Sequence, residues 1–247
     1  MKPFKVKRII SLMALAFLML NNAPVFSADI FQVSSGIREP LSNLQQTGFN
    51  DLVAKEVFKR AGYEINILRM PAARALQDLN NGITDADLVR IRKIDTVYPN
   101  IRVVPEKIID FDFVAISKNL DFKPDGWASL RPYEIGIVSG WRILEMNVKS
   151  DIAVTRVEDT RQLIKILNNN RVDLVVSERW QARQAIKSLA INSLTIHQPP
   201  IKTNEVFIVV HKRHEKLIPK LTSIIKSMKQ DGSFERIYRR TLGKFAE

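Results

Sequence analysis

Apolar side chains recur at regular spacing through residues 48–92, and this stretch gives the clearest pattern in the chain. Over residues 52–61 they follow one face of a helix, which Asn50 and Asp51 can cap at its start and Gly62 can end. Residues 63–68 then alternate polar and apolar side chains, as a half-buried strand does. The pattern predicts a helix followed by a strand.

A second helix and a second strand follow in the same stretch. Pro71 suits the first turn of a helix, which carries Leu76 and Leu79 and ends near Gly82. Residues 85–91 then return to extended structure. Strands that alternate with short helices predict an α/β fold with a parallel sheet, and ligands bind such sheets beyond the carboxyl ends of the strands.

The rest of the chain continues this alternation in further blocks. Residues 101–104 and 108–116 are rich in β-branched and aromatic side chains, and a polar stretch with Pro124 and Gly126 follows them. We expect further strands at 133–138, 154–157, 172–176 and 205–210. We expect further helices after Gly140, after Asp159, at 217–228 and at 233–241.

Two stretches resemble the family 3 extracellular (periplasmic) solute-binding proteins, of the amino-acid ABC transporter type. The first carries G-F-x-D-L from Gly48, a glycine that ends the helix, Pro71 followed three residues later by Arg74, and L-x-x-G-x-x-D ending at Asp85. The second is MKQDGSFERIYRRTLG at residues 228–243, close to the C-terminus, where that family also ends. The resemblance extends over nearly the whole mature chain.

This resemblance implies an α/β fold, the two-lobed periplasmic binding protein fold (type II), with the ligand cleft between the lobes. We expect a discontinuous lobe 1 at residues 29–115 plus 206–247 and a continuous lobe 2 at 116–205, joined by two connections that act as a hinge. Most proteins of this family deliver polar amino acids to ABC importers. The implied partners are therefore a small-molecule ligand and an ABC permease complex at the inner membrane.

Residues 1–27 are typical of a secretory signal peptide. Four basic side chains precede an apolar run over residues 9–20, which is shorter than a typical transmembrane helix. We expect cleavage after Ser27, with Ala28 as the alternative, and an uncleaved N-terminal anchor is the other interpretation. The chain has no cysteine and hence no lipoprotein anchor, so we expect a freely soluble protein of the periplasm.

Composition and charge argue against several other classes of protein. The 247 residues carry a formal charge of +12, and removal of residues 1–27 takes away four basic side chains and leaves +8. The basic residues are scattered without a zinc-finger or RNA-binding motif, so we expect no nucleic acid as partner and a cleft that attracts anions. Three histidines without a cysteine predict no metal site, and we expect no cofactor and a monomer.

Three side chains of the predicted lobe 1 are candidates for ligand binding. Many family members hold the ligand carboxylate with an arginine shortly after the strand that ends here at residue 91, because a guanidinium meets two carboxylate oxygens at once. The resemblance implies this role for Arg90, although the usual Thr-x-x-Arg segment is missing, and Arg74 is a further candidate. Glu39, in the loop after a first strand expected at residues 30–34, can meet a cationic group. The alternative interpretation is that Arg90 and Arg74 are surface arginines and that Glu39 is a solvated acid of the loop.

Four residues of the predicted lobe 2 complete the candidate site. Ser139, Gly140 and Trp141 form a turn before a helix, where free backbone N–H groups and the helix dipole favour a carboxylate. Trp141 can cover the ligand or pack the helix onto its own lobe. Family members usually bind the ligand ammonium with an Asp five residues after the Asp of a strand, and counting from Asp173 places Glu178 there. The alternative for Glu178 is a helix N-terminal acid favoured by the dipole.

These features favour a periplasmic solute-binding protein that captures a small polar, carboxylate-bearing solute, such as an amino acid, for an ABC importer. An enzyme on the same scaffold, similar to periplasmic dehydratases, is one alternative, because Glu39 and Glu178 can face one cleft. The sequence shows no Ser/His/Asp or Cys/His set, so we expect binding without catalysis. The ligand-binding component of a sensor system is the second alternative, which the sequence does not separate from transport.

Overall fold

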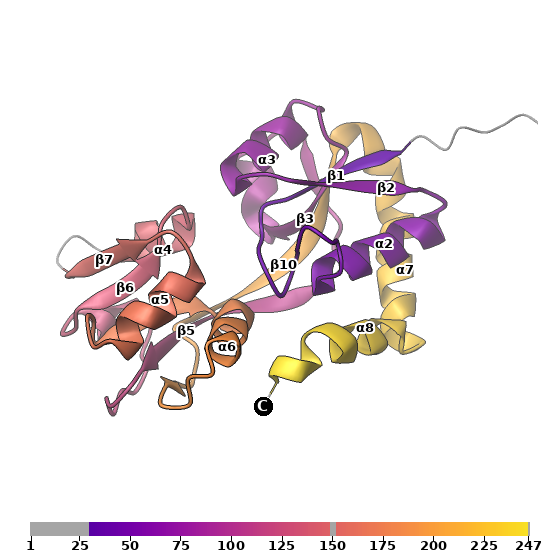
Figure 1. Cartoon of the computed structure of the whole chain (residues 1–247). Helices are drawn as coiled ribbons and strands as arrows, with labels where there is room; N and C mark the ends of the chain where they lie inside the picture. The colour runs from indigo at the N-terminus through magenta and orange to yellow at the C-terminus, as the bar shows by residue number, and fades with distance from the viewer. Residues whose placement is uncertain (1–29, 149–151, 247) are drawn as a thin grey trace, which may run out of the picture.

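The computed structural model describes residues 30–148 and 152–246, so the predicted signal peptide at 1–27 lies outside the described residues. Strands and helices alternate along the described chain, as the sequence predicts (Figure 1). In chain order the elements are β1 (Phe31–Ser35), α2 (Phe49–Ala61), β2 (Ile65–Arg69), α3 (Ala72–Asn80), β3 (Ala86–Ile91), η1 (Arg92–Thr96), β4 (Ile101–Val103), β5 (Ile109–Ser117), η2 (Trp127–Leu130), β6 (Ile135–Val138), α4 (Arg142–Asn147), β7 (Val154–Val157), α5 (Thr160–Asn168), β8 (Leu174–Glu178), α6 (Arg179–Ser188), β9 (Thr195–Ile196), β10 (Lys202–His211), η3 (Lys212–Leu217), α7 (Ile218–Gln230), α8 (Ser233–Thr241) and η4 (Gly243–Phe245).

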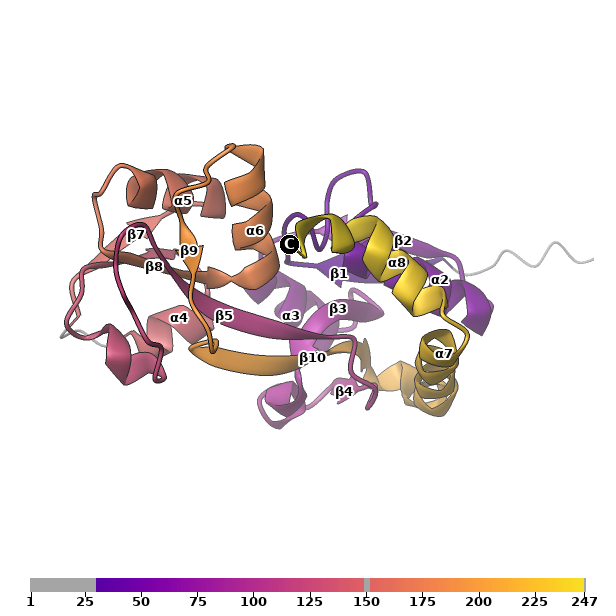
Figure 2. The ribbon, with the colours of Figure 1, turned by 90° about the horizontal axis from the view of Figure 1, so that it is seen from below.

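These elements form two groups, which Figures 1 and 2 show side by side. One group, called lobe 1 below, holds β1 to β4 with α2, α3, α7 and α8. The other, called lobe 2, holds β6 to β9 with α4, α5 and α6. The strands form one ladder in the order β2-β1-β3-β10-β5-β8-β6-β7, with β4 paired to β10 and β9 paired to β5.

The long strands β5 and β10 cross between the two lobes. They pair with each other over residues 109–113 and 202–206. From there β10 continues into lobe 1 along β3 and β4, and β5 continues into lobe 2 along β8 and β9. The parallel pairing that the sequence predicts holds for the strands that alternate with helices in each lobe, but the sheet as a whole is mixed. The chain leaves lobe 1 through β5 and returns through β10, so these two strands run antiparallel to their neighbours, whereas β1 to β3 and β6 to β8 form parallel pairs.

Each lobe is held by apolar packing of its helices on its strands. In lobe 1, Phe49 and Phe58 of α2 are fully buried, together with Ile225 of α7. Burial of one such side chain stabilises a fold by about 1.5–3 kcal/mol. In lobe 2, Leu163 and Leu167 of α5 are buried within a second apolar cluster. The helical stripes predicted from the sequence are thus core-facing.

Helix ends follow the predicted signals in part. Gly62 ends α2 with φ of 91°, a left-handed conformation that glycine adopts without strain. Asp159 caps α5 by accepting a hydrogen bond from the backbone N–H of Gln162 at 2.8 Å. The strand predicted at 172–176 lies instead at 174–178, because Phe113 of β5 pairs with Glu178. The short strand β9 is not predicted by the sequence.

The C-terminal segment reaches across to lobe 2, as Figure 2 shows for α8 beside α6. Arg183 donates a hydrogen bond to the carbonyl of Phe245 at 2.8 Å, and Lys187 donates one to the carbonyl of Lys244 at 2.7 Å. These contacts add a third bridge between the lobes beside β5 and β10. Among the described helices, none has the length and apolar character needed to cross a bilayer.

Candidate functional site

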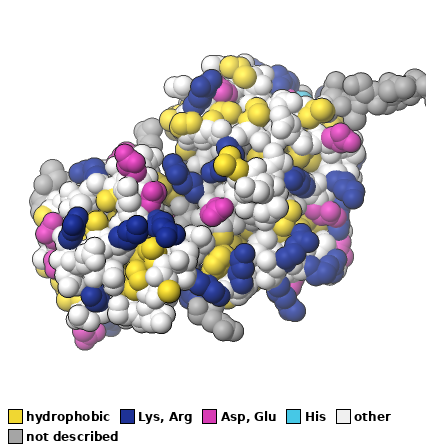
Figure 3. Space-filling view, in the orientation of Figure 1, with side chains coloured by type: hydrophobic (Ala, Val, Ile, Leu, Met, Phe, Trp, Pro, Cys, Tyr) yellow, Lys and Arg dark blue, Asp and Glu magenta, His cyan; other side chains and the backbone are white. Residues whose placement is uncertain are grey.

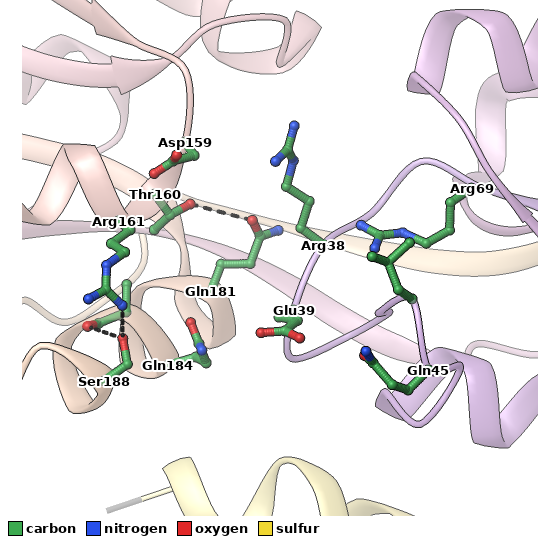
Figure 4. A pocket seen from close by; sticks show the side chains of 12 residues that line it. Arg38, Glu39, Gln45, Arg69, Asp159, Thr160, Arg161, Gln181, Gln184 and Ser188 are labelled. Atoms are coloured by element: carbon green, nitrogen blue, oxygen red, sulfur yellow. Dashed lines mark hydrogen bonds between the residues drawn. The ribbon is translucent and has the colours of Figure 1, made fainter.

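A cleft of about 390 Å³ lies between the lobes, where the loop after β1 faces the first turn of α5 and one side of α6 (Figure 4). Charged side chains of both signs occur along the junction of the lobes (Figure 3). The cleft is lined by Arg38, Glu39, Leu44, Gln45 and Arg69 of lobe 1 and by Asp159, Thr160, Arg161, Gln181, Gln184, Ala185 and Ser188 of lobe 2. A second hollow of about 510 Å³ adjoins it toward α8 and shares Glu39 and Gln184.

The loop that carries Arg38 and Glu39 is anchored by Asp51, whose carboxylate is fully buried. One oxygen accepts a hydrogen bond from the hydroxyl of Ser42 at 2.7 Å. The other accepts hydrogen bonds from the backbone N–H groups of Asn43 and Gly48, both at 3.0 Å. Asp51 therefore sets the position of the loop relative to α2.

Two arginines of lobe 1 extend toward the cleft. Arg38 and Arg69 are both exposed, and Figure 4 shows their guanidinium groups directed into the space between the lobes. The parallel pairing of β1 and β2 places Arg69 opposite Ser35, just before the loop that carries Arg38. Among the described residues, no group accepts a hydrogen bond from either guanidinium. Both are thus free to bind an anion.

Lobe 2 contributes a buried amide to the opposite wall. Gln181 of α6 is 4% exposed, and its side-chain carbonyl accepts a hydrogen bond from the hydroxyl of Thr160 at 3.4 Å. Its side-chain NH₂ group is buried without a hydrogen-bond partner in the described chain. An unpaired buried donor costs about 1–3 kcal/mol, so an acceptor on a bound solute would relieve this penalty. Gln181 can therefore donate to a ligand in the cleft.

The arginines proposed from the sequence lie elsewhere. Arg90 donates hydrogen bonds to the carboxylate of Asp87 at 2.6 Å and to the carbonyl of Ala72 at 3.2 Å, and 12% of its side chain is exposed. Arg74 is 72% exposed and lies 3.5 Å from Asp78 on its own helix. Neither belongs to the lining of the two hollows. Ligand binding by these arginines stays a prediction, whereas Glu39 does lie in the cleft.

Two backbone donors of the turn before α4 already have acceptors within lobe 2. The N–H of Gly140 donates to the carboxylate of Glu145 at 2.8 Å, so this N–H is not free, contrary to the expectation. The physical reason is that α4 carries its own acid in its first turn. The N–H of Ser139 donates to the carbonyl of Val157 at 2.9 Å. Trp141 packs edge to face on Phe113, with ring centroids 5.5 Å apart, whereas ligand binding by Ser139, Gly140 and Trp141 stays a prediction.

Comparisons with known proteins identify the fold of this chain. No family model matches the chain. An uncharacterized protein of Shewanella oneidensis is 24% identical over 207 residues, which cover 80% of this chain and 77% of that protein. A solved ancestral arginine-binding protein bound to arginine superposes with a TM-score of 0.70 at 18% identity, over 86% of this chain and 97% of that chain.

Two further solved structures agree with this comparison. The substrate-binding protein of an amino-acid ABC transporter gives a TM-score of 0.67 at 19% identity, over 87% of this chain and 99% of that chain. A histidine kinase sensor domain with similarity to periplasmic binding proteins gives a TM-score of 0.70 at 14% identity, over 87% of this chain and 96% of that chain. The chain has the periplasmic binding protein fold. The α/β fold class that the resemblance implied is confirmed.

Within the periplasmic binding protein fold, sequence reasoning did not select Arg38, Arg69, Thr160 or Gln181. A signal for them was present, because each residue lies at or just beyond the carboxyl end of a strand: β1, β2, β7 and β8. Those strand ends face the crevice in open α/β sheets. A search of every strand end for polar side chains would have found all four.

Glu178 is buried at the start of α6, where it has the alternative role of a helix N-terminal acid. Its two oxygens accept hydrogen bonds from the backbone N–H groups of Trp180 at 3.1 Å and Gln181 at 3.0 Å. Burial raises the pKa of Glu178 to about 7, against the two backbone hydrogen bonds, which lower it. Glu178 lines neither hollow, and its contact with a ligand amine stays a prediction.

This buried acid makes stability depend on pH. The pKa of Glu178 is about 7 in the folded protein and has an ordinary value of 4.5, so between these values the folded state holds a proton that the unfolded chain releases. We expect this group to lower the free energy of unfolding by about 3 kcal/mol as pH rises through that window. Urea unfolding at several pH values measures the slope. The Glu178→Gln variant should show a flatter profile, and an unchanged slope would contradict the assignment.

Proposed function

We propose that this protein is a periplasmic solute-binding protein that captures a small polar, carboxylate-bearing solute, such as an amino acid, for an ABC importer. The observation that carries the proposal is the cleft between the lobes, which presents unpartnered donors from both sides. Arg38 and Arg69 extend from lobe 1, and the buried amide of Gln181 lies on lobe 2. A cavity of a few hundred Å³ with a few convergent polar groups is typical of a small-molecule site.

Binding in this cleft is proposed to draw the lobes together. The proposed boundaries are residues 29–115 plus 206–247 for lobe 1 and 116–205 for lobe 2. The two crossing strands β5 and β10 suit a hinge, because closure then needs backbone changes in two strands while each lobe keeps its core. A solute held from both lobes favours the closed form by its extra contacts there.

The proposed setting is the periplasm, reached through the signal peptide at residues 1–27, with an ABC permease complex as partner and the monomer as the working form. A solved structure of similar fold is the substrate-binding protein of an amino-acid ABC transporter, which supports the transport role. A sensor role is the second candidate, because a histidine kinase sensor domain has a TM-score of 0.70 to this chain. Loss of solute uptake in a deletion strain would favour transport over sensing.

Mass spectrometry of the small molecules released by denaturing the natively purified protein tests this proposal. We expect one polar, carboxylate-bearing solute in an amount close to that of the protein. Incubation of that solute with the protein should leave it chemically unchanged. Release of no solute, together with no binding of any amino acid, would contradict the proposed function, and conversion of the solute would favour an enzyme.

A further inference from the structure

We propose, on the basis of this function, that the solute is an α-amino dicarboxylate, a small molecule with two carboxylates and one ammonium group. The charges of the cleft carry this inference. Its ionisable lining consists of three arginines and two acids: Arg38, Arg69, Arg161, Glu39 and Asp159. The lining therefore carries a net charge of +1, which one solute of net charge −1 neutralises.

Closure of the lobes turns this balance into selectivity. Charges that lie in water when the cleft is open are screened, but closure removes water and makes each unpaired charge expensive. A solute with one carboxylate and one ammonium leaves one arginine charge uncompensated, and a cationic amino acid adds a further positive charge. A dicarboxylate without an amine leaves one negative charge uncompensated. The α-amino dicarboxylate, with two carboxylates and one ammonium group, compensates the positive and the negative charges of the lining.

The free arginines point to the carboxylates. Arg38 and Arg69 lack hydrogen-bond acceptors among the described residues, and a guanidinium fork meets two carboxylate oxygens at once. Arg161 of α5 makes one long hydrogen bond, 3.4 Å to the hydroxyl of Ser188. By contrast, Arg90 is held by Asp87 inside lobe 1. The anion-binding arginines of this chain are therefore those of the β1–α2 loop and the end of β2.

The acids and the buried amide define the rest of the solute. Glu39 has no hydrogen-bond partner among the described side chains, and Figure 4 shows it facing Gln181 and Gln184 across the cleft. Its carboxylate can accept hydrogen bonds from an ammonium group. The unpartnered NH₂ of Gln181 can donate to a carboxylate oxygen of the same solute. Both lobes then hold the solute by charge and by hydrogen bonds.

Isothermal titration calorimetry with five probes tests this assignment: L-glutamate, L-aspartate, L-glutamine, L-arginine and glutarate. We expect L-glutamate or L-aspartate to bind at least about tenfold more tightly than the other three, since loss of one desolvated charge partner typically weakens binding by that factor or more. Tighter binding of L-glutamine, L-arginine or glutarate would overturn the inference while leaving the proposed function in place. Failure of all probes and release of no solute on denaturation would contradict both.

Variants of the exposed arginines locate the site. Arg38→Gln and Arg69→Gln should each weaken binding of the preferred acid by at least about tenfold. Arg171→Gln is the matched control, because Arg171 is exposed and lies outside the cleft lining. Glu39→Gln should weaken binding of L-glutamate more than that of glutarate, which has no ammonium group. Equal affinities of the parent, Arg38→Gln and Arg69→Gln would overturn the assignment.

Discussion

Replacement of Asp51 with alanine is expected to lower the free energy of unfolding by about 3–5 kcal/mol, because the change leaves three donors without an acceptor. Those donors are the hydroxyl of Ser42 and the backbone N–H groups of Asn43 and Gly48. The loop cannot simply move aside, since a Cβ on Gly48 would already lie 2.5 Å from the carbonyl oxygen of Leu41. The chain is tightly packed where the loop meets α2.

The same substitution should impair binding, because the anchored loop carries Arg38 and Glu39. Denaturant unfolding measures the stability change, and calorimetric titration of L-glutamate at a temperature where the variant is folded measures the affinity. Asp125→Ala is the control, since Asp125 is exposed and its side chain has no partner among the described residues. That control should change stability by no more than about 0.5 kcal/mol. A loss below 1 kcal/mol for Asp51→Ala would contradict the anchoring role.

Replacement of Arg90 with alanine is expected to lower the free energy of unfolding by about 3–5 kcal/mol, the usual consequence of removing one partner of a buried ion pair. Asp87 is 1% exposed, and without Arg90 its charge would be left with the hydroxyl of Ser34 at 3.0 Å and the backbone N–H of Val89 at 3.1 Å. Its desolvation would then be largely uncompensated. Denaturant unfolding of the single variants and the Asp87→Ala/Arg90→Ala double variant measures the coupling.

This experiment also decides between two roles for Arg90. If the ion pair is structural, the double variant is less destabilised than the sum of the single variants, and the affinity of folded Arg90→Ala for its preferred acid is close to that of the parent. A variant of parental stability with at least tenfold weaker binding would instead restore Arg90 as the carboxylate-binding arginine that the resemblance implies.

Local signals made much of the fold predictable. The helix at 233–241 was expected at its observed bounds, and Gly62 ends α2 as expected. The expected cap of α2 at Asn50 or Asp51 is wrong, because the helix already begins at Phe49 and its N-cap is Gly48. The antiparallel pairing of β5 and β10 was not predictable from such signals, because periodicity does not say which strand a chain pairs with. β5 and β10 are apart by more than eighty residues in sequence, and their antiparallel pairing with each other and with β3, β4, β8 and β9 makes the sheet mixed.

The candidate site was harder to predict because the partners of its charges are set by folding. Arg90 and Glu178 were expected to bind the ligand because the family resemblance implies these roles. In the structure, however, Arg90 pairs with Asp87 and Glu178 accepts two backbone hydrogen bonds at the start of α6. Arg38 and Arg69 belong to no motif. They come together because β1 and β2 are parallel neighbours whose carboxyl ends meet at one edge.

Binding of a small solute between the lobes by Arg38 and Arg69 is tested most directly by a paired measurement of released solute. The wild-type protein and the Arg38→Gln/Arg69→Gln double variant are purified natively in parallel, checked for equal folding, denatured, and compared by mass spectrometry. We predict that the wild-type protein releases a carboxylate-bearing solute and that the double variant releases at least about tenfold less. Equal amounts of the same solute from both proteins would contradict the claim.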